Sequence, residues 1–189
     1  MNIFVLHENA SIAAQMMCDK HVVKMIVESG QMLSTAHRVL DGIEYTELSK
    51  NNRRIKRWKL ESQSMEKLLY KASFVGHPCT QWVMQSDKNY LWLAKHALEL
   101  CREYTRRYGK HHKADDMLSL IRYRYPENIN KTVSITPFAQ AMPDEYKTED
   151  AVQAYRAYYL GEKTYFAKWQ YSPTPSWFQE ALNAVQTTH

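Results

Sequence analysis

The feature that most limits the fold is a three-and-four spacing of apolar residues between residues 86 and 108. A helix places residues with this spacing on one face. Gly109 follows the segment, and its last turn is basic, as helix C-termini favour. The segment is therefore predicted to be one long amphipathic helix, with its apolar face formed by Tyr90, Leu93, Ala94, Ala97, Cys101 and Tyr104.

Most of the remaining chain also has helical patterns. Ser11 is the expected cap of a helix that runs to about Leu40, and Pro78 suits the first position of another helix. Residues 3–6 (IFVL) are expected to form a short strand or a buried arm, and residues 126–146 a long loop. Further helices are predicted over about 45–73, 113–125 and 148–169, and from Ser176 onward.

Composition agrees with a helical domain. The chain has 189 residues, of which 44% are hydrophobic, enough for one domain with a real core. Only 5 Gly and 6 Pro leave little room for a turn-rich β-sandwich or barrel. We expect an all-α fold: a single compact multi-helix domain over residues 1–189, with a central N-terminal long helix and an extended N-terminal arm.

Charge and cysteine content bear on partners and compartment. A formal net charge of +5 gives a modest preference for an anionic partner. The cysteines (Cys18, Cys79 and Cys101) are odd in number and lack disulfide-like spacing, which favours a reducing cytosol. The N-terminus lacks a basic n-region and a cleavage site, and no apolar stretch approaches the roughly 20 residues of a membrane span. These features predict a cytoplasmic protein without a membrane partner.

The predicted first helix carries a narrow polar stripe. His21, Lys24, Glu28 and Gln31 are spaced three, four and three residues apart, so they follow one face of a mostly apolar helix. A solvated face with an ordinary Lys24–Glu28 pair explains the pattern about as well as a cleft does. A carboxylate beside a cleft could perform acid–base chemistry, which makes the stripe the candidate active site.

A zinc site is the main metal alternative. Cys18-x-x-His21 and His77-x-Cys79 supply two Cys and two His. The second pair is spaced more tightly than the usual two to four intervening residues, and a free Cys is commonly a small buried hydrophobe. We expect neither a metal nor another cofactor.

Two basic clusters with neighbouring aromatic residues could contact phosphates. Duplex-binding faces need several such contacts, although a solvated helix face gives the same pattern. The candidate nucleic-acid contacts are Lys20, Arg53, Arg54, Arg57, Arg106, Arg107 and Lys110.

Several short segments occur in the order found in a known family. NIFVL precedes Asp19-x-His21, and Glu28 follows that His by seven residues; GHPCT, NYLWLAKHALELCREYTRRYG, MPDEY and PSWF come later. In these segments the chain resembles the pyrimidine-dimer DNA glycosylases of phages and algal viruses (the endonuclease V type), which are small all-α enzymes. The chain is also similar to uncharacterised proteins of tailed phages, in the segments CDKHVVKM, HPCTQWV, TPFAQAMP and PSWF. Residues 41–73 are longer than the family pattern and form a possible insertion.

The resemblance implies a mechanism. In the family, the α-amine of the N-terminal residue attacks C1′ of the damaged nucleotide and leaves a Schiff base, while a glutamate of the first helix transfers protons. That glutamate corresponds to Glu28. An α-amine suits this role because its pKa near 8 leaves a useful neutral fraction at pH 7.

The sequence departs from the family at two points. The family exposes a Thr amine by removing the initiator Met, whereas Asn2 is too large for efficient removal, so the amine would be that of Met1. The arginines with which the family grips DNA are absent, since Val27 precedes Glu28 and Gln31 stands near the other position. Lys20 and Lys24 would replace them with point contacts.

The leading hypothesis is a monomeric DNA-acting enzyme that cleaves or exchanges an N-glycosidic bond at a modified or damaged base of a duplex. It would be a DNA glycosylase that could also act as an abasic-site lyase through an N-terminal amine Schiff base. Glu28, Met1, His21 and Lys24 would be catalytic. A nucleotide- or hypermodified-base-processing enzyme on the same scaffold and a non-catalytic phage protein that binds DNA or a host factor are the alternatives. The candidate substrate-binding residues are Asn2, Gln31, His37, His77, Trp82, Tyr155 and Tyr159.

Overall fold

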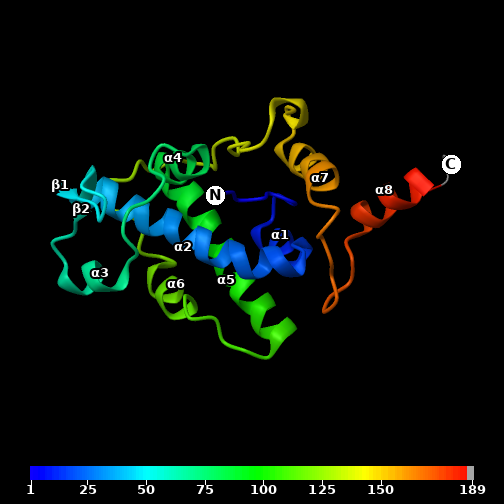
Figure 1. Ribbon diagram of the computed structural model, residues 1–189, viewed down its shortest axis with the longest axis horizontal. Coiled ribbons are helices and arrows are strands. Elements are labelled where there is room, and N and C mark those ends of the chain that lie inside the picture. The colour runs from blue at the N-terminus through cyan, green and yellow to red at the C-terminus, as the bar shows by residue number, and fades with distance from the viewer. Residues whose placement is uncertain (187–189) are drawn as a thin grey trace.

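The computed structural model describes residues 1–186 and is mostly helical (Figure 1). Within those residues it has eight α-helices, one short 3-10 helix and a two-stranded antiparallel sheet, so the expectation of an all-α fold misses the sheet. The helices are α1 (Ala10–Met16), α2 (Asp19–Asp41), α3 (Gln63–Leu68), α4 (Pro78–Gln85), α5 (Asp87–Tyr108), α6 (Asp115–Ile121), α7 (Ala151–Glu162) and α8 (Ser176–Gln186).

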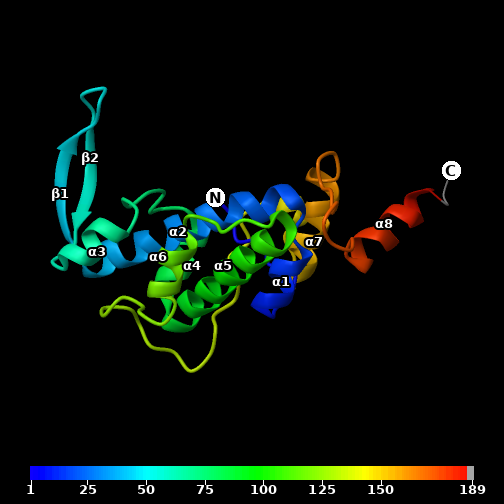
Figure 2. The same cartoon turned by 90° about the horizontal axis from the view of Figure 1, so that it is seen from below.

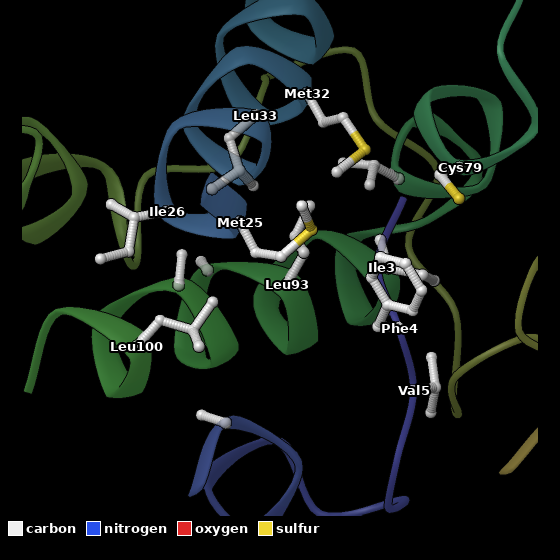
Figure 3. Close-up of a cluster of buried hydrophobic side chains, with 14 of the residues drawn as sticks. Ile3, Phe4, Val5, Met25, Ile26, Met32, Leu33, Cys79, Leu93 and Leu100 are labelled. Carbon is white, nitrogen blue, oxygen red and sulfur yellow. The ribbon is translucent and has the colours of Figure 1, made fainter. Parts of the chain in front are cut away.

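Helices α2 and α5 are the longest, with 23 and 22 residues, and they pack against each other. Helix α1 packs on α5, and α4 packs on both α2 and α5. Figure 3 shows the core between them, where the N-terminal arm passes beside α5 and adds Ile3, Phe4 and Val5 to the side chains of the helices. Burying a side chain of this size contributes about 1.5–3 kcal/mol, so the arm is an integral part of the core.

The prediction for residues 86–108 is confirmed. Ser86 caps α5, because its Oγ accepts a hydrogen bond from the Asn89 N–H at 3.1 Å. Gly109 ends the helix in the left-handed conformation with φ 63°, which glycine adopts without steric cost. Pro78 occupies the first position of α4 and Ser176 begins α8, both as expected.

The predicted helix over residues 11–40 is instead two helices. Asn9, not Ser11, caps α1, and the backbone is extended at Met17 and Cys18. Distant groups take the hydrogen bonds that a continuous helix would have made: the Tyr159 hydroxyl accepts from the Cys18 N–H at 3.1 Å, and the Lys168 carbonyl accepts from the Asp19 N–H at 2.9 Å.

The predicted helix over 45–73 is wrong. The segment forms a hairpin of β1 (Ile43–Leu48) and β2 (Arg54–Lys59), followed by the short α3. Its β-branched and aromatic residues suit strands, and Asn52 closes the turn with φ 55°, a conformation that asparagine tolerates.

Arg38 of α2 fixes the base of the hairpin. Its buried guanidinium donates hydrogen bonds to the Trp58 carbonyl at 3.0 Å, to the Glu66 carboxylate at 2.7 Å and to the Tyr70 carbonyl at 2.6 Å. The hairpin, α3 and the following segment are thereby all tied to one side chain near the end of α2.

The later helices are shorter than expected. Helix α6 occupies only the middle of the predicted 113–125 segment, and α7 ends at Glu162 rather than near Trp169. The long loop between them contains the 3-10 helix Asp144–Tyr146. None of the helices within residues 1–186 combines the length and apolar character needed to cross a bilayer.

Candidate active site at Glu28 and the N-terminus

Glu28 is the point at which α2 meets the N-terminus. Its carboxylate accepts a hydrogen bond from the Asn2 backbone N–H at 2.9 Å. The same oxygen lies 3.8 Å from the Met1 α-amine, and the other oxygen lies 3.5 Å from Lys24 Nζ. Only 13% of the Glu28 side chain is exposed, so the carboxylate lies between two amines in a largely desolvated position.

The side chain of Asn2 holds the amine in place. Its Oδ1 accepts hydrogen bonds from the backbone N–H groups of Ile3, at 2.8 Å, and Phe4, at 3.1 Å. Its Nδ2 donates to the carbonyl of Ala141 at 2.8 Å. This folded-back turn accommodates the uncommon φ of 38° at Phe4 and fixes the direction in which the chain enters the site.

Met1 itself is well packed. Its side chain is 2% exposed, and its Sδ accepts a hydrogen bond from the Thr80 hydroxyl at 3.8 Å. A buried first side chain and a bonded second residue leave the α-amine little freedom to move away from Glu28. Thr80 and Ala141 are site-supporting positions that sequence reasoning missed, because nothing local links them to the N-terminus.

His77 and Cys79 at the start of α4 complete the surroundings of the amine. Burial and the charge of the Met1 amine lower the pKa of His77, and Glu28 partly offsets this. The His77 Nδ1 accepts a hydrogen bond from the Cys79 N–H at 3.2 Å and so caps α4. Burial raises the pKa of the Cys79 thiol to about 11, so it stays protonated and is a poor nucleophile.

His21 belongs to the core and not to the cluster around Glu28. Its ring stacks on Phe4 with centroids 4.4 Å apart, and its Nδ1 lies 2.7 Å from the Tyr159 hydroxyl. Burial, helped by the charges of Lys24 and Lys163, lowers the pKa of His21 to about 3. The imidazole is therefore neutral at physiological pH and supports the arm through Phe4, rather than acting as one of the predicted catalytic residues beside Glu28.

The other residues of the polar stripe differ in their exposure to solvent. The Lys24 side chain is 66% exposed, and Gln31 is half-buried. Val23 and Val27, which the pattern assigned to the apolar side, are 40% and 38% exposed. The outward face of α2 at the site is therefore wider and more apolar than the four stripe residues predicted.

Four of the candidate substrate-binding side chains lie in the core. Tyr155 donates a hydrogen bond to the Ala139 carbonyl at 2.7 Å, and Trp82 donates to the Thr136 carbonyl at 3.4 Å. His37 is 2.9 Å from the Tyr90 hydroxyl, and Tyr159 is fully buried against Cys18 and His21. Packing and internal hydrogen bonds occupy these side chains, so they are not placed to bind a substrate directly.

Arg107 requires a correction among the candidate DNA contacts. Its side chain is 0% exposed and donates hydrogen bonds to Glu103 and Asp19, both at 3.0 Å, and to the carbonyls of Met17 and Gln15. It joins α5 to the ends of α1 and α2 and has no access to a phosphate. The other candidates are at the surface, Lys20, Arg53, Arg54, Arg106 and Lys110 being exposed and Arg57 half-buried.

A shallow groove lies beside the exposed face of α2. It has a volume of about 540 Å³ and combines cationic and aromatic side chains. Residues lining it include Lys20, Val23, Tyr104, Tyr108, Lys110 and Tyr171. Among residues 1–186 no group of three or more His, Cys, Asp or Glu side chains is placed to hold a metal ion.

Comparison with known proteins decides the family. Residues 1–117 match the model of a family described as pyrimidine dimer DNA glycosylase. The chain belongs to this family. The match includes Met1, Asn2, Glu28 and His77, the residues that meet at the N-terminus.

Family membership places the protein among DNA glycosylases, enzymes of DNA repair whose substrate is DNA. It also confirms the resemblance seen in the short sequence segments. No curated protein and no solved structure matches the chain.

Proposed function

We propose that the protein cleaves the N-glycosidic bond of a damaged or modified base in duplex DNA, with the Met1 α-amine as nucleophile and Glu28 as acid and base. The observation that carries the proposal is the placement of that amine 3.8 Å from Glu28 by a buried side chain and a bonded neighbour. The target base has to leave the stack to expose C1′, which is easiest for a base whose pairing is already weakened.

The reaction balances without a cofactor. The neutral amine attacks C1′, forming a C1′–N bond as the bond to the base breaks, and the departing base takes up a proton from solvent. The nitrogen, now bonded to C1′ and positively charged, gives one proton to the Glu28 carboxylate. The C1′–O4′ bond then opens as the C1′=N bond forms, and Glu28 returns its proton to O4′, which leaves a protonated Schiff base.

Two primary amines flank Glu28, and their chemistry favours Met1. An α-amine is intrinsically less basic than a lysine amine, so it more readily supplies the neutral form that attacks C1′. The Lys24 side chain is also 66% exposed and free to move, whereas Met1 is fixed. Lys24 then serves as a charge beside the carboxylate.

Borohydride trapping on a duplex with one abasic site tests this assignment, because borohydride reduces a Schiff base to a stable amine. We expect a covalent adduct, and peptide mapping should place it on residue 1. Lys24→Arg keeps the charge but removes the rival primary amine, so this matched variant should still be trapped. A protein with Gly-Ser joined before Met1 has an amide in place of the amine and should not be.

Absence of any adduct, or an adduct on Lys24, would overturn the proposal. The first intact substrate to assay is a duplex with a single pyrimidine dimer, because the description of the family names this lesion. Base release from that duplex, compared with duplexes that carry other modified pyrimidines, then identifies the target.

A further inference from the structure

The positive charge of the chain is concentrated in the hairpin. Residues 43–59 contain six basic and two acidic side chains, a net charge of +4, whereas the whole chain carries +5. The other 172 residues are therefore almost neutral in sum. An interaction with an anionic polymer would draw mainly on this one element.

The hairpin stands away from the helical body. Figure 2 shows β1 and β2 projecting from the end of α2, on the side on which the N-terminus is drawn. The strands pair over their full length, from Ile43 with Lys59 to Leu48 with Arg54. Six residues of antiparallel strand extend for about 20 Å.

The two ends of the hairpin differ in their bonding. At the base, Arg38 holds the Trp58 carbonyl and Arg57 donates to the Ala72 carbonyl at 3.4 Å. Toward the middle, Lys56 pairs with Glu44 at 2.9 Å and Arg57 with Glu47 at 2.6 Å.

The cations at the tip lack such partners. Lys50, Arg53 and Arg54 are exposed, and none of them forms an ion pair within residues 1–186. Leu48, opposite Arg54, is 64% exposed. The hairpin is thus held firmly at its base, and the cations at its tip are available to bind an anionic partner.

We propose that this hairpin is a DNA-binding arm that enters a groove of the duplex beside the target nucleotide and contacts phosphates through Lys50, Arg53 and Arg54. A two-stranded ribbon has the width that the major groove admits. Phosphate contacts position a protein without reading sequence, which suits an enzyme that recognises a lesion. The inference takes DNA as the partner from the proposed function but does not depend on the chemistry at Met1.

Fluorescence anisotropy with an undamaged duplex tests the arm, because no bond is cleaved in that measurement. Each phosphate contact adds about 0.9 to the slope of log affinity against log salt concentration. Replacing Lys50, Arg53 and Arg54 by Ala should therefore lower the slope by roughly 2–3 and weaken binding near 0.1 M salt by on the order of 100-fold. The replaced side chains are exposed, so the melting temperature should not change.

A matched control removes the same charge elsewhere. Lys95 of α5 and Arg122 and Lys131 of the loop after α6 are exposed and lie outside the hairpin. Replacing these three by Ala should leave the slope within about 0.5 of the original value. Equal slopes for the hairpin variant and the unmodified protein, or equal losses in the two triple variants, would overturn the proposal.

The outcome is separable from that of the trapping experiment. If the slope falls but no Schiff base is trapped, the arm stands and the assigned chemistry fails. If an adduct forms but the slope is unchanged, the chemistry stands and the hairpin has another role.

Discussion

Replacing Glu28 with glutamine tests the centre of the proposed active site with the least change in shape. The amide oxygen of glutamine can still accept the hydrogen bond that the Asn2 N–H donates at 2.9 Å, so the arm keeps its anchor. The substitution removes the negative charge that lies 3.8 Å from the Met1 amine and 3.5 Å from Lys24 Nζ. It also removes the capacity to take up and return a proton.

The expected effect is large on rate and moderate on stability. A positioned acid–base group contributes about 10²–10⁴ in rate, which corresponds to roughly 3–5 kcal/mol of barrier. Loss of a partner from a well-buried ion pair costs about 3–5 kcal/mol of stability. The cost here should be smaller, about 1–3 kcal/mol, because Lys24 is mostly exposed and the Glu28 carboxylate keeps some access to water.

The assay is the single-turnover rate of adduct formation on a saturating abasic duplex in the presence of borohydride. Glu149→Gln is the matched control, since it makes the same chemical change at an exposed position. We expect Glu28→Gln to lower the rate at least about 100-fold and the control to leave it within about twofold. A loss of less than about threefold in Glu28→Gln, with the fold intact, would refute the assignment of Glu28 as acid and base.

Three further outcomes follow from the described contacts. Asn2→Ala removes one donated and two accepted hydrogen bonds. It should lower the free energy of unfolding, measured in urea titrations, by about 2–3 kcal/mol and should slow adduct formation. Unchanged stability would contradict the anchoring role of Asn2. Arg107→Met leaves Asp19 and Glu103 without their buried partner and should lower the free energy of unfolding by about 3–5 kcal/mol. The slope of log DNA affinity against log salt concentration should not change. A slope reduced by about 1 would instead indicate that Arg107 contacts a phosphate. Burial lowers the pKa of His21 to about 3, that of His37 to about 4 and that of His96 to about 3, all below the ordinary value of about 6.5. Between pH 6.5 and these lower values the unfolded chain binds more protons than the folded chain, so the free energy of unfolding should fall as the pH falls below about 6.5, by up to about 1.4 kcal/mol per pH unit for each histidine. Urea titrations between pH 4.5 and 7.5 measure this, and a flat profile would show that the three histidines are not buried in neutral form.

Local signals predicted the parts of the fold that local interactions determine. Helix α5 was recognisable because its cap, its apolar spacing and its terminal glycine all lie within its own sequence. The break between α1 and α2 was not, because the group that holds the Cys18 N–H is the hydroxyl of Tyr159, 141 residues away. The hairpin has no comparable local signal, because its dense basic residues equally suit a solvated helix face.

The candidate site shows the same division. Glu28 could be singled out from the polar stripe and from the family resemblance, and the Met1 amine from the resemblance alone. The bond from Asn2 to Ala141 joins positions 139 residues apart, so no sequence spacing reveals it. Arg107 looked like a phosphate contact in a basic helix end, because its buried partner Asp19 lies 88 residues earlier in the chain.

The shared attachment of Glu28 and Arg38 to α2 has a consequence for how the enzyme measures its substrate. Ten residues of α-helix rise about 15 Å, so the base of the hairpin is held at that axial offset from the reacting carbon. B-DNA rises 3.4 Å per base pair along each strand, so on a duplex that runs parallel to α2 the offset would be about four to five pairs. With the arm engaged, the protein would protect more base pairs on one side of the lesion than on the other. Whether the longer protected side lies 5′ or 3′ of the lesion would give the orientation of the protein on the duplex.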